Sequence, residues 1–239
     1  MSSFDFQQGE LLLIDKPLEW TSFDVVNKIR YAVKRHLGVK KIKVGHAGTL
    51  DPLATGLLLV CTGRNTKKIN EFTGLDKTYD GIITLGGTTD SFDLECEVRP
   101  DEKAPQLTEE LIKNAAQSLV GLQDQVPPAF SAKRINGKKA YELARAGRVV
   151  EMKSHAIEVL GFEITHVEPH ESLPGGWNCH FKIHCSKGTY IRSMARDLGL
   201  ALDCGGYLSA LRRTSIGPYS LEDARNLAEF ITEVDQANS

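Results

Sequence analysis

The stretch Gly45–Gly56 holds the residues best suited to chemistry: a histidine, two threonines and one carboxylate, Asp51, among three glycines. Glycine lets a backbone adopt positive φ or pass close to a ligand. Asp51 precedes Pro52, which favours an extended conformation and gives the carboxylate a fixed direction. The apolar run Leu57–Val60 follows, as expected for a buried strand. The pattern indicates a shaped loop that presents one acid, although an isolated Asp-Pro pair more often starts a turn or caps a short helix.

This loop closely resembles the signature loop of the tRNA pseudouridine-55 synthases, the TruB-type family. Four further motifs resemble those of the same family in the same order: Gly9–Pro17 with Thr21-Ser22, Lys77–Tyr79, Cys185–Ser193 and Gly205–Thr214. With the loop, these motifs cover about residues 9 to 218. Glu19 departs from the pattern, because the family more often has glycine there, and this puts the local turn in doubt. The resemblance implies the pseudouridine synthase fold.

The resemblance also implies a reaction, the conversion of uridine to pseudouridine at position 55 in the T-arm loop of tRNA. Asp51 is the implied catalytic residue. Whether it attacks C1′, adds to the uracil ring or takes the C2′ proton stays open. Arg192 is implied to pair with Asp51 and keep it ionised; outside its motif it would be interpreted as a phosphate contact or a surface charge. Tyr79 is implied to stack on the uracil and relay the C5 proton, although a lone tyrosine in a strand is more often core.

Four more residues are expected around the same pocket. Leu211 would form part of its apolar floor, a role that is hard to distinguish from ordinary packing. His46 is implied to occupy the space that the extruded base leaves, although a histidine in a glycine-rich loop could instead bind local backbone groups. Lys16 and Tyr190 would support the pocket. Extrusion of a stacked uridine costs a few kcal/mol of free energy, and phosphate contacts and stacking of the base in the pocket would offset this cost.

The composition is ordinary for a globular protein of 239 residues, which is compatible with one large domain or two small ones. The N-terminus lacks a basic segment followed by an apolar one, and no apolar run approaches the ~20 residues that a membrane span needs. We therefore expect a cytoplasmic protein that makes no contact with a membrane. The five cysteines include no Cys-x-x-Cys pair, so we expect reduced and mostly buried thiols.

We expect neither a metal nor a cofactor. His180 and His184 alternate with apolar residues as in a strand, which places them about 13 Å apart, too far to share an ion. The implied reaction needs an ionised carboxylate, a pocket that retains the free base and removal of the C5 proton. The sequence offers a candidate for each of these tasks.

The net charge of −2 argues at first against a nucleic-acid partner, but the charges are unevenly distributed. Residues 28–43 contain seven Lys or Arg and no acid, and residues 133–148 contain six Lys or Arg and one acid, Glu142. A single such cluster is often only a solvated face. Two of them beside the motifs favour a phosphate-binding surface for the T-arm of tRNA. We expect a monomer.

The hydrophobic periodicity predicts strands and helices without a regular alternation, and hence an α+β fold with a mixed, largely antiparallel sheet flanked by helices. The predicted strands are 10–15, 57–61, 79–84, 149–165 and 180–184. The predicted helices are 22–37 with Thr21 or Ser22 as cap, 66–72, 108–120 with Leu111, Ala115, Leu119 and their neighbours as apolar face, 140–146, 189–202 and 220–231 with Ser220 as cap. Residues 89–107 are expected to form an irregular acidic loop, and residues 127–137 an exposed basic connection. Residues 1–239 would form a single catalytic domain without the C-terminal PUA domain of many relatives.

Two rival functions stay open. An RNA chaperone could remodel the tRNA elbow without catalysis, although Asp51, Tyr79 and Arg192 speak against a protein that only binds. A nucleosidase could use Asp51 for hydrolysis, and it would release free uracil, whereas a synthase releases none.

Overall fold

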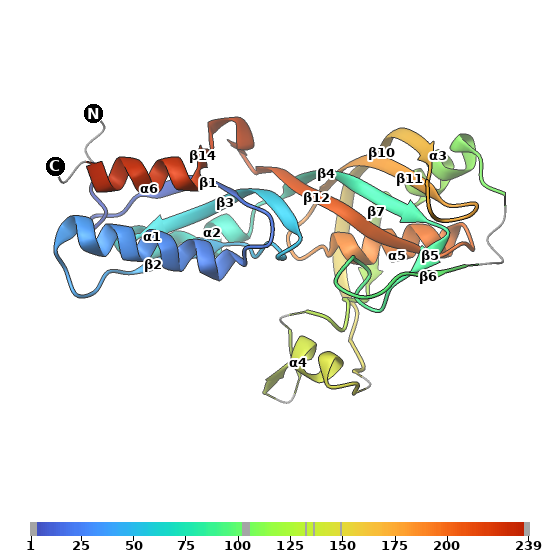
Figure 1. Cartoon of the computed structure of the whole chain (residues 1–239), viewed down its shortest axis with the longest axis horizontal. Helices are drawn as coiled ribbons and strands as arrows, with labels where there is room; N and C mark the ends of the chain where they lie inside the picture. The colour runs from blue at the N-terminus through green and yellow to red at the C-terminus, as the bar shows by residue number, and fades with distance from the viewer. Residues whose placement is uncertain (1–3, 102–105, 132, 136, 149, 237–239) are drawn as a thin grey trace. The chain divides into compact units, whose positions relative to one another are not determined.

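The computed structural model describes residues 4–101, 106–131, 133–135, 137–148 and 150–236 (Figure 1). The chain forms two compact units. Unit 1 comprises Met1–Tyr79 and Leu211–Ser239, and unit 2 comprises Asp80–Ala210. The chain passes from unit 1 to unit 2 within β4 (Lys77–Leu85) and returns within β12 (Gly206–Ile216). That the whole chain acts as one catalytic domain without a PUA domain stays a prediction.

Unit 1 is a small mixed sheet with helices on both faces (Figure 1). β3 is antiparallel to β1 and β2 and parallel to β12; β1 is parallel to β14, and β12 is antiparallel to β13. Besides its parts of β4 and β12, the unit contains β1 (Leu11–Lys16), α1 (Ser22–Leu37), β2 (Val44–Ala47), β3 (Ala54–Thr62), the 3₁₀ helix η1 (Gly63–Lys68), α2 (Ile69–Thr73), β13 (Tyr219–Ser220), the 3₁₀ helix η2 (Leu221–Asp223), β14 (Arg225–Asn226) and α6 (Leu227–Gln236).

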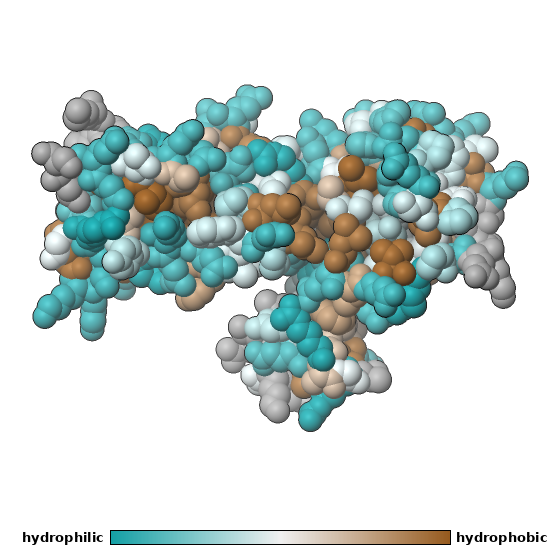
Figure 2. All heavy atoms as spheres, viewed as in Figure 1, coloured by the Kyte–Doolittle hydropathy of each residue, from teal (hydrophilic) through white to brown (hydrophobic). Residues whose placement is uncertain are grey.

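The central strand β3 is apolar on both faces because both faces are covered. Leu58 and Val60 belong to a core that α1 and α6 close, whereas Leu57 and Leu59 belong to a core on the other side, with Ile69 packed against it. Figure 2 shows mainly hydrophilic residues on the outer surfaces of α1 and α6, with hydrophobic residues gathered where the two helices meet. The loop before β3, which carries Asp51, therefore leads into the most buried strand of the unit.

Unit 2 contains a sheet in the order β12, β4, β11, β10, β7, in which β10 is antiparallel to both β11 and β7. The expected α+β class with a mixed and mostly antiparallel sheet is confirmed. The elements of this unit are β5 (Gly87–Thr88), β6 (Arg99–Pro100), α3 (Glu109–Ser118), β7 (Gly121–Gln125), β8 (Arg134–Ile135), β9 (Lys138–Lys139), α4 (Ala140–Arg145), β10 (His155–Pro169), β11 (Trp177–Cys185) and α5 (Ile191–Ala201), with parts of β4 and β12.

The helix α1 matches its predicted bounds because its end signals are strong. The side chain of Thr21 accepts a hydrogen bond from the backbone N–H of Asp24, and the Asp24 carboxylate accepts one from the N–H of Thr21. This capping box satisfies two backbone donors at the first turn. Gly38 ends the helix in the left-handed conformation, with φ of 62°.

The apolar face predicted for α3 is wrong by one position. Leu111 is 50% exposed, whereas Ile112 and Ala116 are buried. The helix begins at Glu109 with Thr108 as N-cap, and its contacts are mainly with β10 and also with α5. Because Ile112 and Ala116 lie one turn apart, they form the stripe that this strand covers.

The prediction that Ser220 caps the last helix is also wrong. Ser220 accepts a hydrogen bond from the N–H of Glu222 and caps only η2. The helix α6 begins at Leu227, and the side chain of Asn226 accepts a hydrogen bond from the N–H of Ala228. The chain first forms β14 beside β1, and this pairing delays the helix.

Other boundaries in unit 2 also differ from the prediction. Pro127 and Pro128 are buried, so the start of the expected exposed connection is not exposed. Its end belongs to a short hairpin, in which β8 pairs with β9. The predicted strand from residue 149 begins at His155; Val149 itself lies outside the described residues. The short strands β2 and β7 were not predicted, because a few residues carry too little periodicity to be recognised.

The cysteines are free thiols, four of them buried, as expected: Cys61, Cys179, Cys185 and Cys204. Within the described ranges, no helix is long and apolar enough to cross a membrane.

Candidate active site

The aspartate loop connects β2 to β3, and the residue before Asp51 is held by the start of α1. The hydroxyl of Ser22 accepts a hydrogen bond from the N–H of Leu50, at 2.8 Å, and donates one to the carbonyl of the same residue, at 3.1 Å. Ser22 is buried and is the first residue of the helix. Because the Thr21 capping box fixes this first turn, the helix start also fixes the backbone next to Asp51.

The residue after Asp51 is held by the connection between β1 and α1. The backbone N–H of Glu19 donates to the carbonyl of Pro52 at 2.9 Å, and the ammonium of Lys16 lies 3.4 Å from the same oxygen. Glu19 has φ of 66°, in the left-handed region that favours glycine. The turn that the sequence left in doubt therefore forms with glutamate, and its geometry explains why the related motif more often has glycine.

Lys16 is a fully buried cation at the centre of that turn. Its ammonium donates to the carbonyls of Pro17, at 2.8 Å, and Trp20, at 2.6 Å. The pKa of Lys16 is lowered to about 8: burial is the main cause, the carboxylate of Asp51 opposes it, and the charge of Arg213 adds to it. The lysine thus lies within the electrostatic reach of Asp51, as its predicted supporting role requires.

His46, Tyr79 and Leu211 lie in the same unit as Asp51. His46 is half-buried on β2, opposite Val60, and its Nδ1 is buried without a hydrogen-bond partner among the described residues. Burial and then the charge of Arg213 lower the pKa of His46, and a hydrogen bond that the imidazole donates to the backbone of Gly48 acts in the opposite direction. The imidazole is therefore neutral at neutral pH.

Tyr79 and Leu211 are both nearly buried, with exposures of 8% and 9%. Tyr79 lies on β4, with the guanidinium carbon of Arg213 6.0 Å from its ring centroid. Leu211 lies on β12 and pairs with Ala54 at the start of β3. Five of the predicted residues thus belong to unit 1: Lys16, His46, Asp51, Tyr79 and Leu211.

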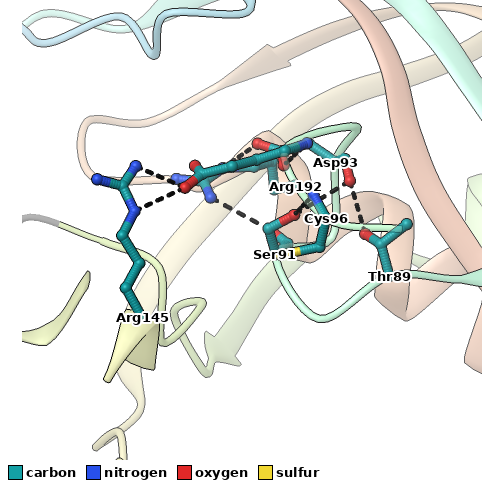
Figure 3. A network of polar contacts seen from close by, with 7 residues as sticks. Thr89, Ser91, Asp93, Cys96, Arg145 and Arg192 are labelled. Carbon is teal, nitrogen blue, oxygen red and sulfur yellow. Dashed lines mark hydrogen bonds and ion pairs between the residues drawn. The ribbon is translucent and has the colours of Figure 1, made fainter. Parts of the chain in front are cut away.

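Arg192 belongs to unit 2, where it is buried on α5 against a folded loop (Figure 3). Its guanidinium donates to the carbonyl of Ser91 at 3.2 Å, and its Nε lies 3.5 Å from a carboxylate oxygen of Asp93. The hydroxyls of Thr89 and Ser91 both donate to the carbonyl of Asp93. These contacts fix the position of the arginine in its unit. Its pairing with Asp51 stays a prediction.

Tyr190 also belongs to unit 2 and is the N-cap of α5. The side-chain amide of Gln125 accepts from its N–H at 2.8 Å and donates to its carbonyl at 3.2 Å. The ring of His155 meets the tyrosine ring edge-on, with the centroids 6.2 Å apart. The start of α5, which carries Arg192, is therefore attached to the end of β7.

Two residues of these networks escaped the sequence analysis. Asp93 was assigned to an irregular acidic loop, yet it is 5% exposed and pairs with Arg192. The sequence signal for this folded loop was the Thr and Ser residues just before Asp93, because such side chains often form hydrogen bonds to the backbone of a loop. Arg213 is 1% exposed; it follows Leu211 and Arg212 in a motif from which only the leucine was selected.

The described residues contain no group of three or more His, Cys, Asp or Glu that could hold a metal ion. His180 and His184 lie on β11, so the predicted strand is confirmed at these positions. Two buried cations lie near the Asp51 segment: Lys16, whose charge interacts with that of Asp51, and Arg213, which donates to the carbonyl of Gly48. The arrangement suits a carboxylate whose position beside a substrate is fixed by the protein.

Comparisons with known proteins agree with this interpretation. Residues 34–191 match the family described as "TruB family pseudouridylate synthase (N terminal domain)", and residues 192–238 match the "tRNA pseudouridylate synthase B C-terminal domain". The tRNA pseudouridine synthase B of Phocaeicola vulgatus is 48% identical over 232 residues, which cover 97% of this chain and 96% of the relative. The protein of the same name from Chlorobaculum tepidum is 50% identical over 234 residues, which cover 98% of this chain and 94% of the relative.

Solved structures share the fold. A chain of the "Crystal Structure of a Cbf5-Nop10-Gar1 Complex" is 25% identical with a TM-score of 0.69, and the match covers 98% of this chain and 60% of that one. A chain of the "Structure of H/ACA RNP bound to a substrate RNA containing 2'-deoxyuridine" is 24% identical with a TM-score of 0.66, and the match covers 95% and 53%. This chain thus spans little more than half the length of those two. Because the sequence matches cover almost the whole chain at close to half identity, the chain belongs to the TruB family of pseudouridylate synthases.

Proposed function

We propose that this protein is a tRNA pseudouridine synthase that isomerises uridine to pseudouridine at position 55 in the T-arm loop. The family assignment supports this proposal, and so do the names of relatives that match over nearly their full length. The observation that carries it is the backbone support of Asp51, in which Ser22 holds Leu50 and the β1–α1 turn holds Pro52. A fixed carboxylate is what a reaction at the ribose needs.

In the proposed reaction, Asp51 acts at the sugar while the N-glycosidic bond of the uridine breaks. The uracil turns, and its C5 joins the same ribose C1′. Whether the carboxylate attacks C1′, adds to the uracil ring or removes the C2′ proton stays open. Arg192 would keep Asp51 ionised. Tyr79 would stack on the uracil and relay the C5 proton.

His46 would take the place of the base that is extruded from the stack. A neutral imidazole is a flat ring with little cost of desolvation, so its low pKa suits insertion between bases. Leu211 would contribute to the apolar floor of the pocket, and Tyr190 would support the pocket from the start of α5. Lys16 would keep the turn that holds Pro52 in place.

We propose that the substrate is the T-arm of tRNA, and that the exposed cations of residues 28–43 contact its phosphates. In this part of the chain Lys28, Lys40, Lys41 and Lys43 are exposed. The proposal includes a monomer that acts in the cytoplasm without a metal or a cofactor, because a carboxylate and the ribose of the RNA suffice for the chemistry.

The test is to incubate the purified protein with a T-arm transcript and to map pseudouridine at nucleotide resolution. We expect product at the T-loop uridine and no free uracil. Absence of product with folded protein would overturn the proposal. Release of uracil would instead identify a hydrolase, and unmodified RNA with an altered fold would identify a chaperone.

A further inference from the structure

The guanidinium of Arg213 joins the two ends of the segment that carries Asp51. Its Nε donates to the carbonyl of Leu57 at 2.8 Å, and one of its terminal nitrogens donates to the carbonyl of Gly48 at 3.1 Å. Gly48 precedes the aspartate by three residues and Leu57 follows it by six. One planar cation therefore fixes the distance between the entry and the exit of the loop.

The backbone of Arg213 supports the same segment. Arg213 on β12 pairs with Gly56 on β3, which has φ of 101°. A Cβ atom at Gly56 would lie 2.3 Å from the carbonyl oxygen of Arg213, closer than any side chain can approach. Only glycine lets the two strands approach so closely at this point. The loop is thus held by the main chain of Arg213 as well as by its side chain.

The same guanidinium also contacts a second residue of the site. Its central carbon lies 6.0 Å from the ring centroid of Tyr79, within the range of a cation–π contact. Tyr79 is 8% exposed, so little water competes for its ring. One side chain therefore contacts both the segment that carries the predicted catalytic acid and the aromatic ring that would stack on the base.

Stability alone is a poor explanation for this arginine. Its partners are two neutral carbonyls and a ring, and no carboxylate of the described residues forms an ion pair with it. Burial of a cation without an acid is costly, and an apolar side chain of similar length would avoid the cost. The charge also acts on its surroundings, because it helps to lower the pKa of both His46 and Lys16.

We propose that Arg213 is a positioning residue for the isomerisation: it holds the loop that carries Asp51 and the ring of Tyr79 in the geometry that the reaction needs. This inference rests on the proposed function. It extends that function by a residue that need not touch the RNA.

The test compares three variants of Arg213. Arg213→Lys keeps the charge but loses the planar fork, Arg213→Gln keeps an amide donor but loses the charge, and Arg213→Ala leaves a space for added guanidinium ion. Arg225→Lys and Arg225→Ala are the matched controls, because Arg225 lies in the same unit on β14, is half-exposed and pairs with Glu233. For each protein, the single-turnover rate at saturating enzyme, the Kd for a T-arm hairpin and the melting temperature are measured.

We expect the turnover of all three Arg213 variants to fall by about 100-fold or more, with Kd within about threefold, because the lost contacts act on the reacting geometry. Guanidinium at a few millimolar should restore part of the turnover of Arg213→Ala and leave that of Arg225→Ala unchanged. The control variants should keep saturated rates within about threefold of wild type.

Near-normal turnover of folded Arg213→Lys and Arg213→Gln would overturn the inference. The inference would also be overturned if the loss of activity came wholly from a weaker Kd. Failure of every Arg213 variant to fold would overturn it too, because the arginine would then be needed for stability. The wild-type protein separates the two proposals: if it forms no pseudouridine at the T-loop, the proposed function fails, whereas normal wild-type activity with active Arg213 variants refutes only the role of Arg213.

Discussion

At the residue scale, the proposed chemistry depends on one carboxylate whose two neighbours along the chain are each fixed by other parts of unit 1. Ser22 holds Leu50, and Lys16 with Glu19 holds Pro52. None of these contacts needs the carboxylate itself. A change of the Asp51 side chain can therefore be made while the loop backbone keeps its support.

Asp51→Asn keeps nearly the same shape and removes the charge and the nucleophilic oxygen. If Asp51 performs the chemistry, this variant should lose essentially all turnover, while tRNA affinity stays within about tenfold, or ~1.4 kcal/mol, because other residues make the phosphate contacts. Melting temperature, Kd and single-turnover pseudouridine yield are measured on one preparation. If Asp51 only caps a turn, the loss would appear as ~1 kcal/mol of stability with turnover retained.

Lys16 gives a prediction for stability against pH. Its pKa in the folded protein is about 8, below the ordinary 10.5, because its ammonium is buried. Between these values the unfolded chain holds a proton that the folded protein has released, so unfolding takes up a proton and stability rises with pH. From pH 7.5 to 9.5, the stability of wild type relative to Lys16→Met should rise by about 2 kcal/mol.

Urea denaturation of both proteins at the two pH values measures this difference, and groups other than Lys16 cancel in the comparison. Parallel stability changes in wild type and Lys16→Met would show that the lysine keeps its ordinary pKa. A stability difference that moves in the opposite direction would mean that its partners outweigh the effect of burial.

The sequence could identify the acid but not all the residues that hold it in place. Asp51 was recognisable because its loop is contiguous in the chain, with glycines and a proline at short spacing. The contact of Arg213 with Gly48 joins residues 165 positions apart. The pairing of Asp93 with Arg192 also joins residues far apart in the chain. Local patterns contain no information about such contacts, so the supporting residues became visible only in the fold.

At the scale of elements, long helices with clear end signals were predicted well and short strands were not. The capping box and Gly38 define α1 at both ends. The strand β14 contains two residues, whose pairing with β1 depends on a partner that lies more than 200 positions away. This tertiary contact outweighed the capping preference of Ser220 and moved the start of α6 to Leu227.

The two candidate caps of α6 can be compared directly. Asn226→Ala removes the acceptor for the N–H groups of Ala228 and Glu229 and should lower the free energy of unfolding by about 1 kcal/mol. Ser220→Ala affects only the short helix η2 and should cost less. Urea midpoints of both variants provide the measurement. A larger loss for Ser220→Ala would mean that the helix depends on the earlier cap after all.

At the scale of the whole molecule, a protein with a net charge of −2 must attract RNA through the distribution of its charges. The seven cations of residues 28–43 are not equivalent in the structure. Arg30 donates to the carbonyl of Val44, and Arg35 pairs with Asp235. Lys28, Lys40, Lys41 and Lys43 are exposed, and none of them forms an ion pair with another described residue. These four lysines are the exposed cations of the segment that form no ion pair among the described residues.

RNA binding should therefore weaken steeply with salt, and this dependence should come largely from those four lysines. Each phosphate contact releases counterions from the RNA, so each Lys→Ala change that removes a contact should reduce the slope of log K against log salt by about one unit. The measurement is the Kd for a T-arm hairpin at several salt concentrations, for single variants and for the fourfold variant.

Lys113→Ala is the control, because Lys113 is partly exposed but pairs with Glu109 on α3. An unchanged slope in the fourfold variant would mean that the RNA binds elsewhere on the protein. If Lys113→Ala changed the slope as much as a single variant of the four lysines, the effect would come from the net charge of the protein and not from these positions.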